Sequence, residues 1–275
     1  MLIPFTSIGL VAIFSSLVQA HFIAPDKLQR RAELQKCSNS DSKFQNSLDG
    51  WILERGSTAD NYEFAPDGGL VMKITAPEKH QRLFDNSSIE NLPYNKYEGK
   101  GFTFNATSYM QYGKFSAKLK SANVPGAVTA VILIADNGDE IDFEILTGGD
   151  QTITSNYFWG QKIVYGVNGR TIDPPALPAC DQFYTYGIDW SPDRIIWTID
   201  GKEIRTETRK QANGAYPTGA ARVQIGLWDG SGVSGTAQWA RGPINWDERK
   251  NEDIRAYVKD VTIECSPKTN KVTKK

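Results

Sequence analysis

Apolar and polar residues alternate along short runs through most of the chain after residue 67. The runs are rich in β-branched and aromatic residues, and glycine-containing turns separate them. This pattern is typical of β-strands. We expect strands within 68–76, 112–122, 127–135, 139–146, 153–159, 183–190, 194–199 and 222–228.

The turns and the lack of helical periodicity indicate how these strands are arranged. Asp200-Gly201 lies between two strand-like runs and predicts a tight hairpin. No helical period is sustained, and we expect one short helix within 245–257. Two antiparallel sheets packed face to face are the most economical way to bury so many strands. The sequence therefore predicts an all-β sandwich.

Alternation also assigns side chains to the two faces of a strand. Within 139–146 the apolar side chains take the core side and three acids take the other: Ile141, Phe143 and Ile145 against Glu140, Asp142 and Glu144. Within 222–228 the apolar set is Val223, Ile225 and Leu227, and the opposite set is Arg222, Gln224, Gly226 and Trp228. We expect one sheet surface to carry acidic, polar and aromatic groups.

Three acids without a base on one strand face are unusual, because neighbouring like charges destabilise a sheet. Their repulsion raises the pKa of one carboxyl group and leaves its neighbour ionised, so one acid can donate a proton while another attacks. Retaining glycoside hydrolysis uses such a pair, with the carboxyl groups about 5–5.5 Å apart. Residues four apart on a strand are about 13 Å apart at Cα, so the strand must twist or curve to bring Glu140 and Glu144 together. A structural or calcium-binding strand is the alternative, with residues 136–140 as a source of oxygen ligands.

The charge balance limits the classes of partner. Lys and Arg number 31 against 32 Asp and Glu, which gives a net charge of −1. This balance indicates no nucleic-acid partner and no membrane partner. Two carboxylates suffice for glycoside chemistry, and His21 and His80 are the only imidazoles, so we expect no metal and no cofactor.

The ends of the chain differ from its middle. Residues 1–20 are uncharged, apolar in the middle and end in Val18-Gln19-Ala20, which is typical of a secretory signal peptide. Pro, Thr and Ser interrupt the apolar run, which argues against a membrane anchor. We expect 21–36, with the dibasic pair Arg30-Arg31, to be an N-terminal arm or propeptide. Residues 37–266 are then the β-sandwich domain and 267–275 a basic polar tail.

Cysteines and glycosylation motifs agree with secretion. Three cysteines allow one internal disulfide, and we favour Cys180 with Cys265 because Cys37 lies next to the N-terminal arm. Asn86 and Asn105 each begin an N-glycosylation motif. The protein is expected to be secreted and extracellular.

The acid-rich strand and its surroundings resemble a known family. Glu140-Ile141-Asp142-Phe143-Glu144 is similar to the E-x-D-x-E signature of glycoside hydrolase family 16. The wider resemblance is to the fungal Crh-type chitin–glucan transglycosylases of the cell wall. It covers roughly residues 100–265 and rests on "YGKFSAKLKSANVPGAVTAVILIADNGDEIDFEILTGGD", "SNYFWGQ", "FYTYGIDWSPDRIIWTIDGKEIR" and "RVQIGLWDGSGVSGTAQWARGPINW".

The resemblance implies a concanavalin-like β-jelly roll, in which two curved antiparallel sheets form a concave sugar-binding cleft. It implies that Glu140 is the nucleophile and that Glu144 is first the general acid and then the general base. Asp142 would assist by a proton or hydrogen bond that tunes Glu140. The strand would be regular, without a bulge.

Sugar-binding residues are expected on the same surface, because pyranose rings need flat apolar faces and polar groups at their edges. The resemblance implies this role for Asn156, Tyr157, Trp228 and Trp239. Gln224 joins them from the face assignment alone.

Some residues depart from the Crh pattern. The Crh pattern often has Trp at the positions of Phe143 and Ile145. It has a cysteine pair near the mature N-terminus, where this chain has only Cys37, and a glycine at the position of Arg241. The last change puts acceptor choice in question.

The resemblance implies a monomeric, retaining glycosidase or transglycosylase that cross-links chitin and β-glucan in the cell wall. A β-1,3(4)-glucan hydrolase of the same family and a catalytically silent, lectin-like glycan binder are the alternatives.

Overall fold

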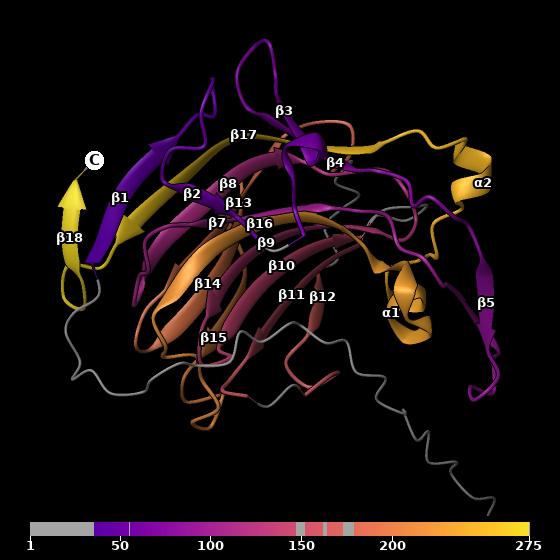
Figure 1. Cartoon of the computed structure of the whole chain (residues 1–275). Coiled ribbons are helices and arrows are strands. Elements are labelled where there is room, and N and C mark those ends of the chain that lie inside the picture. The colour runs from indigo at the N-terminus through magenta and orange to yellow at the C-terminus, as the bar shows by residue number, and fades with distance from the viewer. Residues whose placement is uncertain (1–35, 55, 147–151, 162–163, 173–178, 275) are drawn as a thin grey trace, which may run out of the picture.

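The protein is an all-β sandwich of two arched sheets, as the sequence predicts (Figure 1). The computed structural model describes residues 36–54, 56–146, 152–161, 164–172 and 179–274. The expected signal peptide (1–20) and all but the last residue of the expected arm (21–36) lie outside the described residues. No helix among those described is long and apolar enough to cross a membrane.

The larger sheet contains nine strands in the described chain. Its main path runs β15-β14-β13-β8-β17-β1-β18, and β4 joins β3 to β17. The strands are β1 (Lys36–Ser42), β3 (Tyr62–Phe64), β4 (Leu70–Ile74), β8 (Gly113–Lys120), β13 (Tyr184–Trp190), β14 (Arg194–Ile199), β15 (Lys202–Thr208), β17 (Ile254–Cys265) and β18 (Lys271–Lys274).

The smaller sheet contains seven strands in the order β12-β11-β10-β9-β16-β7-β2. They are β2 (Trp51–Leu53), β7 (Phe102–Ala106), β9 (Ala127–Ala135), β10 (Glu140–Leu146), β11 (Thr152–Phe158), β12 (Arg170–Ile172) and β16 (Ala221–Asp229). The acid-rich strand is therefore β10, and its pairing with β9 and β11 is antiparallel and uninterrupted. A regular ladder on both sides fixes which β10 side chains face outwards.

The core fills the space between the two sheets. Ile141, Phe143 and Ile145 are at most 1% exposed. The Phe143 ring meets the Tyr186 ring of the other sheet edge-on, with centroids 5.5 Å apart. The face assignment for β10 is confirmed, because the apolar set anchors the strand while the acids stay on the outer side.

The hairpin and short helices complete the described elements. Asp200 and Gly201 have φ of 48° and 75°, the paired positive values that a two-residue hairpin turn requires, and they join β14 to β15. Helix α2 (Trp246–Arg249) lies within the segment expected to be helical. Helix α1 (Ser234–Trp239), the 3-10 turns η1 (Ala59–Asn61) and η2 (Gly230–Gly232), and the separate hairpin of β5 (Arg82–Asp85) and β6 (Leu92–Asn95) were not expected.

The predicted disulfide is wrong. Cys37 bonds to Cys265, with their Cα atoms 6.0 Å apart. The N-terminal segment around Cys37 is a sheet strand, since β1 pairs antiparallel with β17, the strand that ends at Cys265. The expected basic tail also joins the sheet, where β18 pairs in parallel with β1.

Candidate active site

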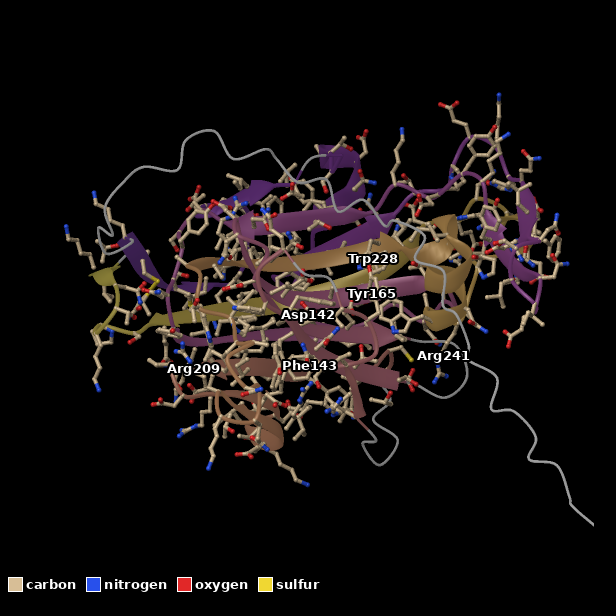
Figure 2. All side chains as sticks on the ribbon, turned by 90° about the horizontal axis from the view of Figure 1, so that it is seen from below. Asp142, Phe143, Tyr165, Arg209, Trp228 and Arg241 are labelled. Atoms are coloured by element: carbon tan, nitrogen blue, oxygen red, sulfur yellow. A yellow bond between two sulfur atoms is a disulfide. The ribbon has the colours of Figure 1, made fainter. Side chains whose placement is uncertain are left out.

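Glu140, Asp142 and Glu144 share one side of β10, which we call the acid face. Residues directly opposite one another in paired strands point to the same side of a sheet. The register thus assigns further residues to the acid face: Ala130, Ile132 and Ile134 of β9, Thr154, Asn156 and Phe158 of β11, Arg222, Gln224, Gly226 and Trp228 of β16, and Asn105 of β7. Figure 2 views the protein from below, where Asp142, Tyr165 and Trp228 lie close together in projection.

The three carboxyl groups are electrostatically coupled. Burial raises the pKa of Glu144 to about 8, and the nearby charge of Glu140 adds to the rise. Burial also raises the pKa of Asp142 well above its usual range, with the charges of Glu140 and Glu144 acting in the same direction. Burial raises the pKa of Glu140, but its hydrogen bond with Asp142 opposes that rise. No Lys or Arg of the described chain is among the causes of these shifts.

These shifts give the acids different protonation states. Asp142 is 2% exposed, and its Oδ1 has no hydrogen-bond partner among the described residues. Burying an oxygen without a hydrogen-bond partner costs far less free energy on a neutral carboxylic acid than on a carboxylate. Asp142 therefore holds a proton and donates a hydrogen bond to Glu140, while Glu144 is protonated at neutral pH. The arrangement can supply one ionised carboxylate and one proton donor on the same face.

The other sheet supports the inner side of β10. Trp197 of β14 is fully buried and donates a 2.9 Å hydrogen bond from Nε1 to the main-chain oxygen of Asp142. The guanidinium of Arg205 lies 4.4 Å from the Trp197 ring centroid and donates to the main-chain oxygens of Ser155 and Asn168. A polar contact therefore crosses the core to the back of the acid strand.

A second fixed point lies immediately before Glu140. The Asp139 carboxylate is 2% exposed and accepts hydrogen bonds from the main-chain N–H groups of Gly160, Thr218 and Gly219 at 2.6, 2.6 and 2.7 Å. It joins the start of β10 to the turn after β11 and to the segment before β16. At Gly219 an added Cβ would lie 2.5 Å from Asn137 Oδ1, so a larger residue there would have to displace that side chain.

The residues predicted to bind sugar fall into two groups. Asn156 lies opposite Asp142 on the acid face, and its Oδ1 accepts from the N–H of Tyr157. Tyr157 itself is 3% exposed and pairs with Ile141 on the core side, so it does not belong to the acid face. Strand alternation separates these two neighbours, because consecutive side chains point to opposite sides.

The predicted tryptophans form one aromatic surface at the end of β16. Trp228 and Trp239 stack with centroids 6.1 Å apart and planes 20° apart. Trp228 is half-buried and Trp239 of α1 is 37% exposed. Their open faces suit a sugar ring.

Arg241 follows this surface and has φ of 62°, in the left-handed region that favours glycine. Its Nη2 donates to Thr152 Oγ1 at the start of β11. The arginine therefore connects the end of α1 to the sheet beside β10.

Tyr165 is a neighbour of the acids that sequence reasoning missed. Partial burial raises the pKa of its phenol, and the charges of Glu140 and Glu144 raise it further. Its ring meets Phe158 edge-on, with centroids 6.2 Å apart, and is 61% exposed. An aromatic residue between glycine-containing turns after β11 was the available signal, but the sequence does not show that this loop folds back over the acids.

One predicted glycosylation site conflicts with the packing. Asn105 is 1% exposed on the acid face, and its Nδ2 donates to Glu54. A glycan on that nitrogen is incompatible with this packing. Asn86 lies exposed in the turn between β5 and β6, where a glycan has room.

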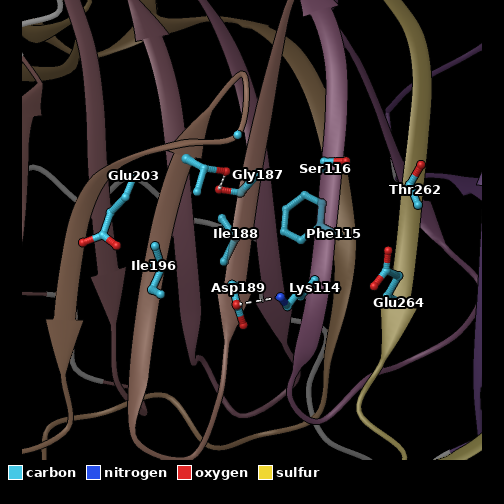
Figure 3. A pocket seen from close by; sticks show the side chains of 12 residues that line it. Lys114, Phe115, Ser116, Gly187, Ile188, Asp189, Ile196, Glu203, Thr262 and Glu264 are labelled. Atoms are coloured by element: carbon cyan, nitrogen blue, oxygen red, sulfur yellow. Dashed lines mark hydrogen bonds and ion pairs between the residues drawn. The ribbon is translucent and has the colours of Figure 1, made fainter.

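A polar groove on the larger sheet lies away from these groups (Figure 3). Lys114 and Asp189 form a 3.1 Å ion pair there. Phe115, the aromatic residue in its lining, is 3% exposed and belongs to the core. The groove offers no stacking surface for a sugar. The described residues contain no cluster of three or more His, Cys, Asp or Glu arranged to hold a metal ion.

A family model for glycosyl hydrolases family 16 matches residues 69–250. The chain belongs to this family. Crh-like protein UTR2 of Candida albicans is 35% identical over 183 residues, which cover 63% of this chain and 37% of the relative. Probable glycosidase CRR1 of Saccharomyces cerevisiae is 36% identical over 186 residues, covering 63% and 43%. The chain thus spans less than half the length of these curated relatives.

Solved structures of the family share the fold. Crh5 transglycosylase in complex with NAG has a TM-score of 0.68 at 26% identity, covering 84% of this chain and 86% of that one. The Bacillus licheniformis β-glucanase has a TM-score of 0.64 at 20% identity, covering 82% and 98%. The β-jelly-roll fold that the resemblance implied is confirmed.

Proposed function

We propose that this family 16 protein is a retaining transglycosylase of β-linked cell-wall polysaccharides. The observation that carries the proposal is the acid face of β10, where three interacting carboxyl groups differ in protonation and no Lys or Arg of the described residues contributes to their pKa shifts. The similarity to Crh-like proteins and to a Crh5 transglycosylase solved with NAG supports chitin and β-glucan as the polysaccharides.

The chemistry follows from the two protonation states. The Glu140 carboxylate attacks the anomeric carbon, and the glycosidic C–O bond breaks as Glu144 gives its proton to the departing oxygen. A covalent glycosyl-enzyme results. Glu144, now ionised, takes a proton from an acceptor hydroxyl, whose oxygen attacks the anomeric carbon and releases Glu140. Asp142 keeps its proton and steadies the charge on Glu140 through their hydrogen bond.

The acceptor decides between transfer and hydrolysis. A sugar hydroxyl as acceptor gives a new glycosidic bond. Water as acceptor gives hydrolysis, the reaction of the alternative function, a β-glucan hydrolase. The stacked Trp228 and Trp239 rings and the exposed Tyr165 ring support occupation by a sugar, because the tryptophans offer an aromatic surface at the end of β16 and Tyr165 offers one beside the acids. We further propose that the protein acts as a secreted monomer, with residues 1–20 as its signal peptide and without a metal or cofactor.

Glu140→Gln and Glu144→Gln test the assignment. Each keeps the shape of the side chain but removes the nucleophile or the proton donor, so turnover of an oligosaccharide donor should fall by about 100-fold or more. Binding of the oligosaccharide, measured by calorimetry, should remain. Glu264→Gln makes the same chemical change at an exposed position of β17 and should leave turnover unchanged. Full turnover in either acid variant would show that the roles are assigned wrongly.

A further inference from the structure

A buried amide on the acid face connects an outer carboxylate to a residue near the acids. Asn105 of β7 lies opposite Gln224 of β16 in the register. It is 1% exposed, so it cannot itself contact a polysaccharide to any useful extent. Both ends of its amide are occupied: Nδ2 donates to Glu54, and Oδ1 accepts a 2.8 Å hydrogen bond from Gln224 Nε2.

Glu54 sets the direction of the hydrogen bonds that link it to Asn105 and Gln224. A carboxylate has no hydrogen to donate, so it can only accept from Asn105, whose NH₂ must then face Glu54. The carbonyl oxygen of Asn105 must face the other way, and Gln224 has to turn its NH₂ toward it. The orientation of each amide follows from the hydrogen-bonding capacity of its neighbour.

The last group in this series of hydrogen bonds is Gln224, whose Oε1 atom is held as an acceptor. With Nε2 held by Asn105, the Oε1 atom of Gln224 is the free end of the amide, and no donor from the described residues reaches it. Gln224 and Asp142 are both opposite Ile132, on the two neighbouring strands of β9. At 4.7–4.9 Å between strands, their Cα atoms are about 10 Å apart. A sugar bound across the sheet beside the acids would therefore reach Gln224.

We propose that Glu54 and Asn105 are positioning residues that hold Gln224 Oε1 as an acceptor for a substrate donor, either a ring hydroxyl or an acetamido N–H. The proposal rests on the proposed function, because it places the same polysaccharide on the acid face. It adds that this position selects a hydrogen-bond donor on the sugar. If the amide were free to rotate, it would accept or donate equally well, and the contact would discriminate less.

Equilibrium binding in the inactive Glu140→Gln background tests this arrangement. A chito-oligosaccharide and a laminari-oligosaccharide are titrated against that protein and against versions that also carry Gln224→Met, Glu54→Gln or both. Gln224→Met keeps the length of the side chain and removes the acceptor, so at least one of the sugars should bind about fivefold more weakly. Glu54→Gln should weaken the same sugar about threefold, because a neutral amide no longer dictates the direction of Asn105.

The double variant is decisive. Once the Gln224 oxygen is absent its orientation has no effect, so the double variant should bind as Gln224→Met alone does. Weaker binding of the chito-oligosaccharide only assigns a donor that the laminari-oligosaccharide lacks, the acetamido N–H or the free 3-hydroxyl. Weaker binding of the laminari-oligosaccharide, alone or with the other, assigns a hydroxyl.

Two results would overturn the proposal: unchanged binding of both sugars by Gln224→Met, or effects of the two substitutions that simply multiply. Melting temperatures confirm that each variant is folded, and Glu264→Gln serves as the control for loss of a carboxylate. Because binding requires no turnover, this result is independent of the proposed chemistry. Absence of turnover in the unmodified protein would overturn the chemistry and leave the binding result intact.

Discussion

At the scale of single residues, the unusual feature is an acid strand whose charges are not offset. The carboxyl groups of Glu140, Asp142 and Glu144 are buried and lie close to one another, so ionising all three is costly. The protons therefore stay on Asp142 and Glu144 at neutral pH, and the remaining charge settles on Glu140. In the proposed reaction the trio supplies an acid and a nucleophile, with a protonated neighbour between them.

The raised pKa of Glu144 predicts the alkaline limb of the pH profile. Glu144 must be protonated to assist the leaving group, and its pKa is about 8, so kcat/KM for an unactivated oligosaccharide donor should fall as the pH rises through about 8. A nitrophenyl glycoside has a leaving group that needs no proton, and its glycosylation rate should lack this fall. The pH–rate profiles of both donors check the assignment. A fall of equal size with the nitrophenyl donor would mean that another group causes it.

At the scale of elements, β10 is held at its inner side and at its start. Its inner side receives the Trp197 hydrogen bond from the opposite sheet, and its start is fixed by Asp139. These contacts oppose small shifts of the strand relative to its neighbours. Catalysis is sensitive to such shifts, because a displacement near 1 Å can misalign reacting groups.

Trp197→Phe tests whether the contact across the core supports catalysis. The substitution keeps a buried ring but leaves the Asp142 main-chain oxygen without this donor, so kcat should fall about tenfold while binding of substrate changes less than twofold. Trp51→Phe is the matched control. Trp51 is also buried and donates a 2.9 Å hydrogen bond, to Ser42 Oγ, but it lies in β2 at the far edge of the sheet. Both variants should lose stability, and equal losses of kcat would refute a specific role for Trp197.

Strand periodicity predicted those elements whose alternation is unbroken. All eight strand-like runs contain strands, and β10 has the assigned faces. The longest strand, β17, escaped prediction because its register shifts between Val258 and Asp260, which breaks the alternation. Tyr157 was misplaced because the resemblance was followed where alternation with Asn156 pointed the other way.

Contacts between distant segments could not be predicted from local pattern. The Cys37–Cys265 bond depends on β1 lying beside β17, which no local signal reveals. The position of Tyr165 near the acids likewise depends on how one loop folds back. The acid trio was found because its chemistry is contained within a single strand.

At the scale of the whole molecule, the two sheets of the sandwich differ in role: the larger sheet is structural, and the smaller sheet carries the candidate active site. The larger sheet joins both ends of the described chain through β1, β17 and β18, with the disulfide between the first two. The smaller sheet carries the acids on its interior strand β10, with the Trp228 and Trp239 surface at the end of β16. Arg241 connects that surface to β11. In the proposed function, one sheet thus holds the polysaccharide while the other provides rigidity.

The most direct test of the proposed transglycosylase is an assay for transfer. The purified protein is incubated with a chitin or β-glucan donor and a fluorescent oligosaccharide acceptor, and the labelled products are sized by chromatography. The acid-face chemistry with a sugar as acceptor predicts growth of fluorescent polymer, which Glu140→Gln should abolish. Shortened sugars without fluorescent polymer would contradict transfer, and intact donor would contradict catalysis altogether.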